Sequence, residues 1–129
     1  MAAGEGFHGT YDELIRYADG NKFTYRGGVR TDCLRTGDRC MSAFVDTDAK
    51  LEAFVFGNRS WTRNATFDNS CPSGGTSHTH ITATLPLPPE PQNPVTLLAG
   101  HGYKESTGTK CASTALDYTF TRTGDCPAR

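Results

Sequence analysis

The stretch "TDCLRTGDRCMSAFVDTDAKLEAFVFG" (residues 31–57) contains a cysteine pair followed by two alternating apolar segments. Six residues, including a Gly-Asp turn signal, separate Cys33 from Cys40. Zinc knuckles space their ligands two to four residues apart and a redox Cys-x-x-Cys motif needs two, so neither matches this spacing. Six residues can bring two antiparallel strand ends together, and the spacing therefore favours a hairpin disulfide over a metal role. A stapled hairpin indicates an oxidising, extracytoplasmic compartment.

The two segments that follow predict the clearest β-hairpin of the chain. Residues 40–46 and 50–57 alternate with period two and flank the short turn "TDA". The aliphatic residues share one face and the aromatic residues share the other: Met41, Ala43, Val45, Leu51, Ala53 and Val55 against Phe44, Phe54 and Phe56. Because both faces are apolar, we expect this hairpin to lie centrally in the fold.

The rest of the chain also reads as short β-strands. Further strands are expected at 22–31, 59–67, 79–87, 95–105 and 115–123, with a tight turn at 18–21, a bulge at Gly27-Gly28 and an extended polyproline crossing at 86–94. Residues 7–17 fit either a strand or one short N-terminal helix. The pattern predicts an all-β, mainly antiparallel, disulfide-stapled sandwich or barrel.

Length and charge restrict the organisation and the partners. The 129 residues carry a net charge of −1, which predicts one domain over 7–123, after a disordered start or cloning remnant at 1–6 and before a tail at 124–129. Mixed charges give no basic face for nucleic acid and no polybasic stretch for lipid. No apolar run reaches the length of a membrane helix, and the first residues lack a signal-peptide pattern. No cofactor is predicted.

The order of the motifs resembles a module of mycobacterial cell-envelope proteins. The resemblance rests on the Cys33/Cys40 pair before an alternating strand, on the Trp61 strand, and on the segments "SCPSGGTSHTHITATLPL" (70–87) and "TKCASTALDYTFTRTGDCP" (109–127). It covers most of residues 8–126. Such modules occur in secreted and lipid-anchored proteins and in extracytoplasmic sensor regions of transmembrane serine/threonine protein kinases.

This resemblance implies a non-catalytic sensor domain that recognises an envelope ligand or a partner protein. In a kinase, ligand-biased formation of a homodimer would bring the kinase domains together. The alternatives are a free-standing secreted or lipid-anchored envelope protein that binds a small apolar molecule, and a secreted hydrolase. We expect a second disulfide between Cys71 and Cys111, with the pairing of Cys111 to Cys126 as its competitor.

Two groups of side chains are candidate binding sites. The aromatic group consists of Phe44, Phe54, Phe56 and Trp61, which large aromatics in a small β core explain more readily than a ligand patch. We expect Trp61 to lie partly exposed at its edge, because Arg59 and Arg63 share the face of Trp61 at period two.

The second group consists of histidines. His78 and His80 share one strand face and could form a zinc site with His101, but outward polar positions on a Thr-rich strand are the favoured explanation, and no metal is predicted. No catalytic residues are predicted, because no Gly-x-Ser-x-Gly motif occurs and no carboxylate stands in a marked apolar setting. Glu52 is expected to point outward or to pair with an arginine.

Overall fold

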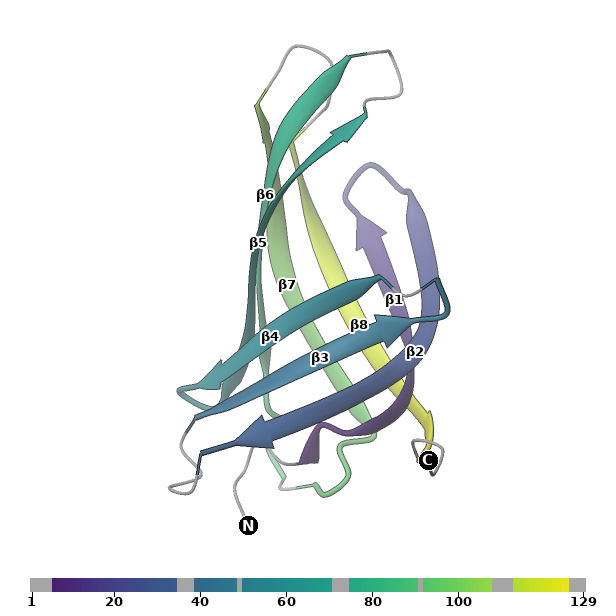
Figure 1. Cartoon of the computed structure of the whole chain (residues 1–129), viewed down its shortest axis with the longest axis vertical. Helices are drawn as coiled ribbons and strands as arrows, with labels where there is room; N and C mark the ends of the chain where they lie inside the picture. The colour runs from purple at the N-terminus through teal and green to yellow at the C-terminus, as the bar shows by residue number, and fades with distance from the viewer. Residues whose placement is uncertain are drawn as a thin grey trace.

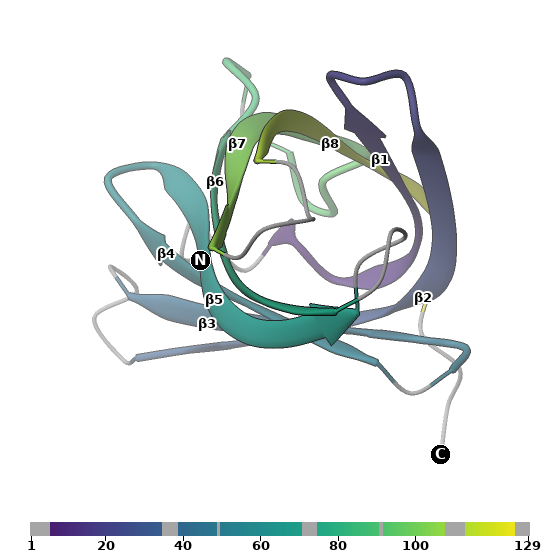
Figure 2. The same ribbon diagram turned by 90° about the horizontal axis from the view of Figure 1, so that it is seen from above.

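The computed structural model describes residues 6–34, 39–48, 50–70, 75–90, 92–107 and 113–125. Within them the chain forms eight strands: β1 (Gly9–Tyr17), β2 (Lys22–Cys33), β3 (Cys40–Asp46), β4 (Leu51–Gly57), β5 (Ser60–Ser70), β6 (Thr76–Pro86), β7 (Leu97–Thr107) and β8 (Thr114–Gly124). Each strand pairs antiparallel with the next, and β8 pairs with β1 to close the barrel (Figures 1 and 2). The all-β antiparallel prediction is confirmed, with the barrel as the correct alternative and a strand, not a helix, at 9–17.

Closure gives every strand one face inside the barrel and one outside. In β6, Thr79, Ile81 and Leu85 are buried, whereas the alternating Thr82 and Thr84 are exposed. Eight strands enclose an interior just wide enough for side chains to fill or for one small ligand. The period-two alternation of the sequence therefore becomes an inside and an outside.

The β3–β4 hairpin shows the effect most clearly. Its phenylalanines point inward, and its aliphatic residues form directly opposed pairs on the outer face: Met41 with Val55, Ala43 with Ala53, and Val45 with Leu51. The four larger ones are 41–62% exposed. The expectation that both faces of the hairpin lie centrally is wrong, because a single-layer barrel covers only the inner face of each strand.

The turn at 18–21 is confirmed, whereas the bulge at Gly27-Gly28 is not. The backbone N–H of Asn21 donates to the Asp19 carboxylate at 3.0 Å, and Gly20 has a φ of 97°. β2 pairs in register with β1 and β3 through both glycines. Gly27 permits close packing instead, since a Cβ there would lie 2.2 Å from the Val45 carbonyl oxygen.

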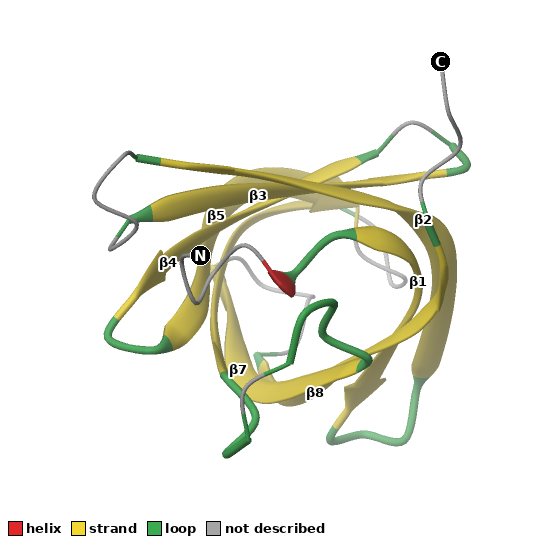
Figure 3. Cartoon of the chain, turned by 90° about the horizontal axis from the view of Figure 1, so that it is seen from below, coloured by secondary structure: helices red, strands yellow, loops and turns green. Residues whose placement is uncertain are grey.

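The lower end of the barrel is closed by residues 6–8 and by the segment between β6 and β7 (Figure 3). Gly6 accepts a backbone hydrogen bond from Val95 at 2.7 Å, and the Tyr11 hydroxyl donates to the Val95 carbonyl at 2.5 Å. Phe7 is thereby held inside the barrel, 1% exposed. Phe7 therefore occupies the lower part of the interior.

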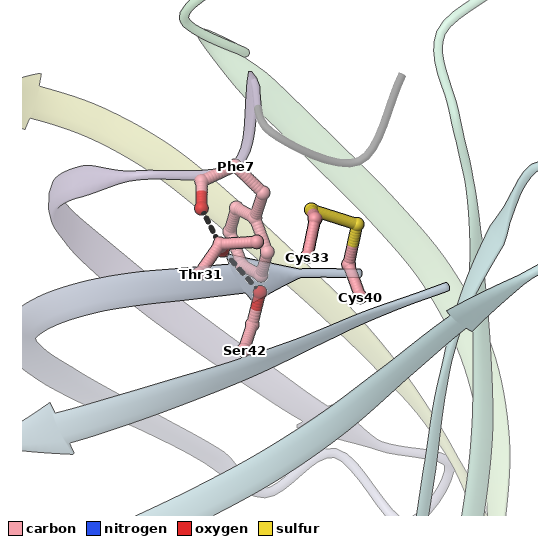
Figure 4. The surroundings of a disulfide bond; sticks show 5 residues. All are labelled: Phe7, Thr31, Cys33, Cys40 and Ser42. Carbon is pink, nitrogen blue, oxygen red and sulfur yellow. Dashed lines mark hydrogen bonds between the residues drawn. A yellow bond between two sulfur atoms is a disulfide. The ribbon is translucent and has the colours of Figure 1, made fainter. Parts of the chain in front are cut away.

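The Cys33–Cys40 disulfide is present and staples the lower ends of β2 and β3. The two cysteines are direct cross-strand partners (Figure 4). Beside them, the Thr31 hydroxyl hydrogen-bonds with the Phe7 carbonyl oxygen and with the Ser42 hydroxyl. The confirmed bond indicates an oxidising, extracytoplasmic setting.

The remaining cysteines, Cys71, Cys111 and Cys126, lie outside the described residues, so the second disulfide stays a prediction. The described part of the chain contains no helix with the length and hydropathy needed to cross a membrane.

Candidate functional site in the upper interior of the barrel

The lower interior is an aromatic layer that contains all four aromatic residues predicted as ligand contacts. Rings of Phe7, Phe44, Phe54 and Phe120 meet edge to face at centroid distances of 5.3–6.3 Å. Trp61 packs against Phe56 and Phe7, with ring centroids 5.0 and 5.5 Å away. This layer matches the core alternative, and a ligand contact by Phe44, Phe54, Phe56 or Trp61 stays a prediction.

The expectation of a partly exposed Trp61 is wrong, because its side chain is 0% exposed. Arg63 does share the face of Trp61, as the period-two argument required. That face, however, points into the barrel, so the arginine marks a polar interior.

Directly above the aromatic layer lies a polar group that we call the upper cluster: Glu13, Glu52, Arg63 and Tyr118. Each member stands two residues from an aromatic side chain of the lower layer on its own strand, and two residues is one step along the same face. The pairs are Tyr11 and Glu13 on β1, Glu52 and Phe54 on β4, Trp61 and Arg63 on β5, and Tyr118 and Phe120 on β8. The strand period therefore stacks one layer on the other.

Arg63 connects three strands within the upper cluster. Its Nη1 donates a 2.7 Å hydrogen bond to the Tyr118 hydroxyl, and its Nε lies 3.8 Å from Glu52 Oε1. The Arg63 and Glu52 side chains are only 12% and 14% exposed. The ion pair is therefore largely shielded from water, where charge interactions are strong.

Glu13 is the least satisfied member. It is 0% exposed, and no N–H or hydroxyl group of the described residues donates to either of its carboxyl oxygens. Glu52 Oε1, Arg63 Nε and Trp61 Nε1 also lack a hydrogen-bond partner among the described residues. Because buried polar atoms in folded proteins are almost always paired, this concentration of unpaired atoms requires an explanation.

Glu13 keeps its proton at neutral pH. Burial raises the pKa of Glu13 to about 10, and the negative charge of the neighbouring Glu52 acts in the same direction. The buried carboxyl group of Glu13 is therefore neutral in the free protein.

Two half-buried tyrosines lie on the inner face of the barrel near Glu13. Tyr25 is the cross-strand partner of Glu13, and Tyr17 lies four residues further along β1 on the same face. The Lys104 ammonium lies 5.5 Å from the centroid of the Tyr17 ring. The upper end thus joins aromatic surface to the buried acids.

The barrel wall is weakest between β4 and β5. Their ladder contains three pairs, from Gly57↔Ser60 to Val55↔Thr62, whereas the β5–β6 ladder contains eleven. Beyond Val55 and Thr62 the strands diverge (Figure 1). Glu52 and Arg63 lie on opposite sides of this wedge, and their ion pair spans it.

The outer side of the wedge is hollowed. A hollow of about 690 Å³ is lined in part by Ala53 and Val55 of β4 and by Thr62 and Asn64 of β5. The hollow therefore lies on the outer face of the wall, beside the wedge that the Glu52–Arg63 ion pair spans.

The three histidines weighed as zinc ligands each have a separate partner. His78 bonds to Asp68, His80 Nε2 lies 2.7 Å from the Asn64 side-chain oxygen, and His101 Nδ1 lies 2.6 Å from Asp117. In the β6–β7 ladder His80 faces Glu105, whereas His101 faces Thr84, four residues away. Among the described residues no three His, Cys, Asp or Glu side chains are grouped to hold a metal.

Sequence reasoning missed Glu13 and Tyr118. For Glu52, the pairing with an arginine is correct but the outward orientation is wrong. The signal that could have found the cluster is a polar residue two positions from a core aromatic, repeated on several strands.

No protein-family model, no curated protein and no solved structure matches this chain. The resemblance to the mycobacterial envelope module stays a prediction.

Proposed function

We propose that this chain is a non-catalytic ligand-binding module that takes a small molecule into the upper interior of its barrel. The observation that carries the proposal is Glu13, a fully buried carboxyl group without a donor to either oxygen. Burying such a group is unfavourable unless a partner satisfies it. A ligand that reaches Glu13 and Glu52 would supply that partner.

The surroundings of the cluster suit a molecule with one polar end. The polar end would lie against the two glutamates, and an apolar or aromatic body would extend toward Tyr17 and Tyr25. Ligand sites of this kind are mostly apolar, with a few placed polar groups that fix orientation.

In its cellular role, the module is proposed to be an extracytoplasmic sensor domain of a transmembrane serine/threonine protein kinase. The disulfide and the resemblance to the envelope module support this placement. Ligand-biased dimerisation would transmit the signal, and a free-standing envelope protein is the alternative. A transmembrane helix and a kinase domain encoded in the same full-length gene product would decide for the sensor.

A secreted hydrolase is the second candidate, favoured by the adjacent carboxyl groups of Glu13 and Glu52. Acid–base hydrolysis needs a group that gives and regains a proton near the working pH. The pKa of Glu13, raised to about 10, fits that task poorly. Turnover of generic ester, glycoside or peptide substrates that disappears in Glu13→Gln would support the hydrolase and contradict the binding module.

The binding proposal can be tested with Trp61, the single tryptophan of the sequence, which lies one step below the cluster. We expect small molecules that raise the melting temperature to change Trp61 emission. Glu52→Gln should remove both responses. Glu105→Gln, a matched change on the outer face of β7, should retain them. Responses that persist unchanged in Glu52→Gln would place binding elsewhere and contradict the proposal.

A further inference from the structure

We infer that the ligand carries an ammonium group, as in a primary or secondary organic amine, and that this group binds between the carboxyl groups of Glu13 and Glu52. The inference rests on the proposed function and names the chemical class that the upper interior would select.

The first argument is the charge of Glu13. Among the described residues, the inward-facing acids of the upper half are Glu13, Glu52 and Asp46, and Glu52 is paired with Arg63. The Asp46 carboxylate accepts backbone hydrogen bonds from Asp48 and Lys50, both at 2.9 Å. Glu13 has no donor, and in the free protein a proton neutralises it. A cationic group of a ligand can take the place of that proton.

The second argument is the hydrogen-bonding inventory. The unpaired atoms of the glutamates, both oxygens of Glu13 and Oε1 of Glu52, are acceptors once Glu13 has lost its proton. A primary ammonium has three donors and no acceptor, so it can satisfy all three atoms and supply the missing charge. These hydrogen bonds would be charge-assisted, the stronger kind.

Other ligand chemistries fit less well. A carboxylate ligand would find Arg63 but would add a further acid beside Glu13 and Glu52, which is repulsive. A neutral hydroxyl has a single donor, leaving most of the acceptors unpaired and the charge uncorrected. A metal ion would need more ligands than two carboxyl groups, and no such group occurs in the described part of the chain.

The aromatic side chain of Tyr17 agrees with an amine whose body is apolar or aromatic. The Lys104 ammonium lies over the face of Tyr17, at 5.5 Å, so this ring face attracts a cation. Tyr17 lies four residues after Glu13 on the same face of β1, so the body of a bound amine can extend toward this ring.

Binding must release a proton. Free Glu13 holds a proton, and the bound ammonium takes its place, so the protein with its proton and R–NH₃⁺ give the complex and one H⁺ in solvent. The other titratable groups around Glu13 are Asp46, Arg63 and three tyrosines: Tyr17, Tyr25 and Tyr118. Burial raises the pKa of each tyrosine, so none of them can supply this proton at neutral pH.

The experiment uses three amines, methylamine, benzylamine and octylamine, each beside the alcohol and the carboxylate of the same carbon skeleton. Calorimetry at pH 7 in two buffers of different ionisation enthalpy measures affinity and proton release together. We expect at least one amine to bind tenfold or more tightly than its alcohol and carboxylate, with release of about one proton per ligand. Glu13→Gln should weaken its binding about tenfold or more and abolish the release, whereas Glu105→Gln should change neither.

Two outcomes would overturn the inference in distinguishable ways. If an alcohol or a carboxylate binds more tightly than its amine, and Glu13→Gln weakens it, the ammonium is wrong but the interior site stands. If no member of the series and no molecule of a wider screen perturbs Trp61, the proposed function fails as well.

A measurement on the wild-type protein covers the case in which Glu13→Gln does not fold. The carboxyl carbon of Glu13, followed by NMR, should move to the carboxylate position when the amine is added. A carbon that stays at the protonated position during amine binding would overturn the inference.

Discussion

The lower and upper halves of the barrel interior use the same strands for opposite purposes. Below, rings such as Phe54 and Phe120 are fully buried and pack against one another. Above, one step along the same strands, Glu52 and Tyr118 face inward. Aromatic burial is strongly favourable, whereas burial of Glu13 without a donor is unfavourable. The lower half therefore stabilises the domain, whereas the buried polar groups of the upper half lower its stability and are the groups proposed to bind a ligand.

The largest expected effect is in the aromatic layer. Phe54→Ala should lower the free energy of unfolding by about 3–5 kcal/mol, because it leaves a cavity among several fully buried rings. Chemical denaturation measures the loss. Val55→Ala, the neighbouring residue on the outer face, should change stability by no more than about 0.5 kcal/mol. Equal effects of the two variants would refute the assignment of inner and outer faces.

The disulfide should contribute the next largest effect, also to the lower half. Replacing Cys33 and Cys40 together by serine should lower stability by about 2.5 kcal/mol, as expected from the entropy of closing so short a loop. Wild-type protein under reducing conditions should approach the stability of the variant. A double variant that matches the oxidised wild type would show that the bond adds nothing.

In the upper half, in contrast to the lower half, a substitution should raise the stability of the protein. Above pH 4.5 the unfolded state loses the proton of Glu13, whereas the folded state keeps it up to about pH 10. Wild-type stability should therefore fall as the pH rises between these values. Glu13→Gln should remove this slope and stabilise the protein at pH 7 by about 1–3 kcal/mol. Urea denaturation between pH 4.5 and pH 10 measures the free energy of unfolding of both proteins. A Glu13→Gln variant that is less stable than the wild type at pH 8 would contradict the raised pKa of Glu13.

The smallest effect should come from Tyr118→Phe. The change removes the hydroxyl that accepts from Arg63 Nη1, and stability should fall by about 1 kcal/mol. Tyr103→Phe, an exposed tyrosine on the next strand, is the control and should have almost no effect. Thermal unfolding of the two variants side by side makes the comparison, and identical melting temperatures would show that this hydrogen bond adds no stability.

The strands, the turn at 18–21 and the cysteine pair could be predicted because their signals are local. Closure could not, because it depends on pairing β1 with β8, about 100 residues apart, as in Tyr11↔Arg122. The hairpin of β3 and β4 was ambiguous because both of its faces are apolar. Glu13 could not be recognised from its own strand, since what makes it unusual is contributed by β4, β5 and β8.

The short ladder between β4 and β5 makes the ring of strands mechanically uneven. Local opening of a closed sheet occurs most often where the fewest hydrogen bonds hold two strands together. Spontaneous openings should therefore concentrate between β4 and β5. Glu52 lies on β4 and Arg63 on β5, and a molecule that binds the buried acids also holds these two strands together. In the proposed role, a ligand bound in the interior would slow amide hydrogen exchange along residues 51–54. The wall would open less often, and its average structure would stay the same.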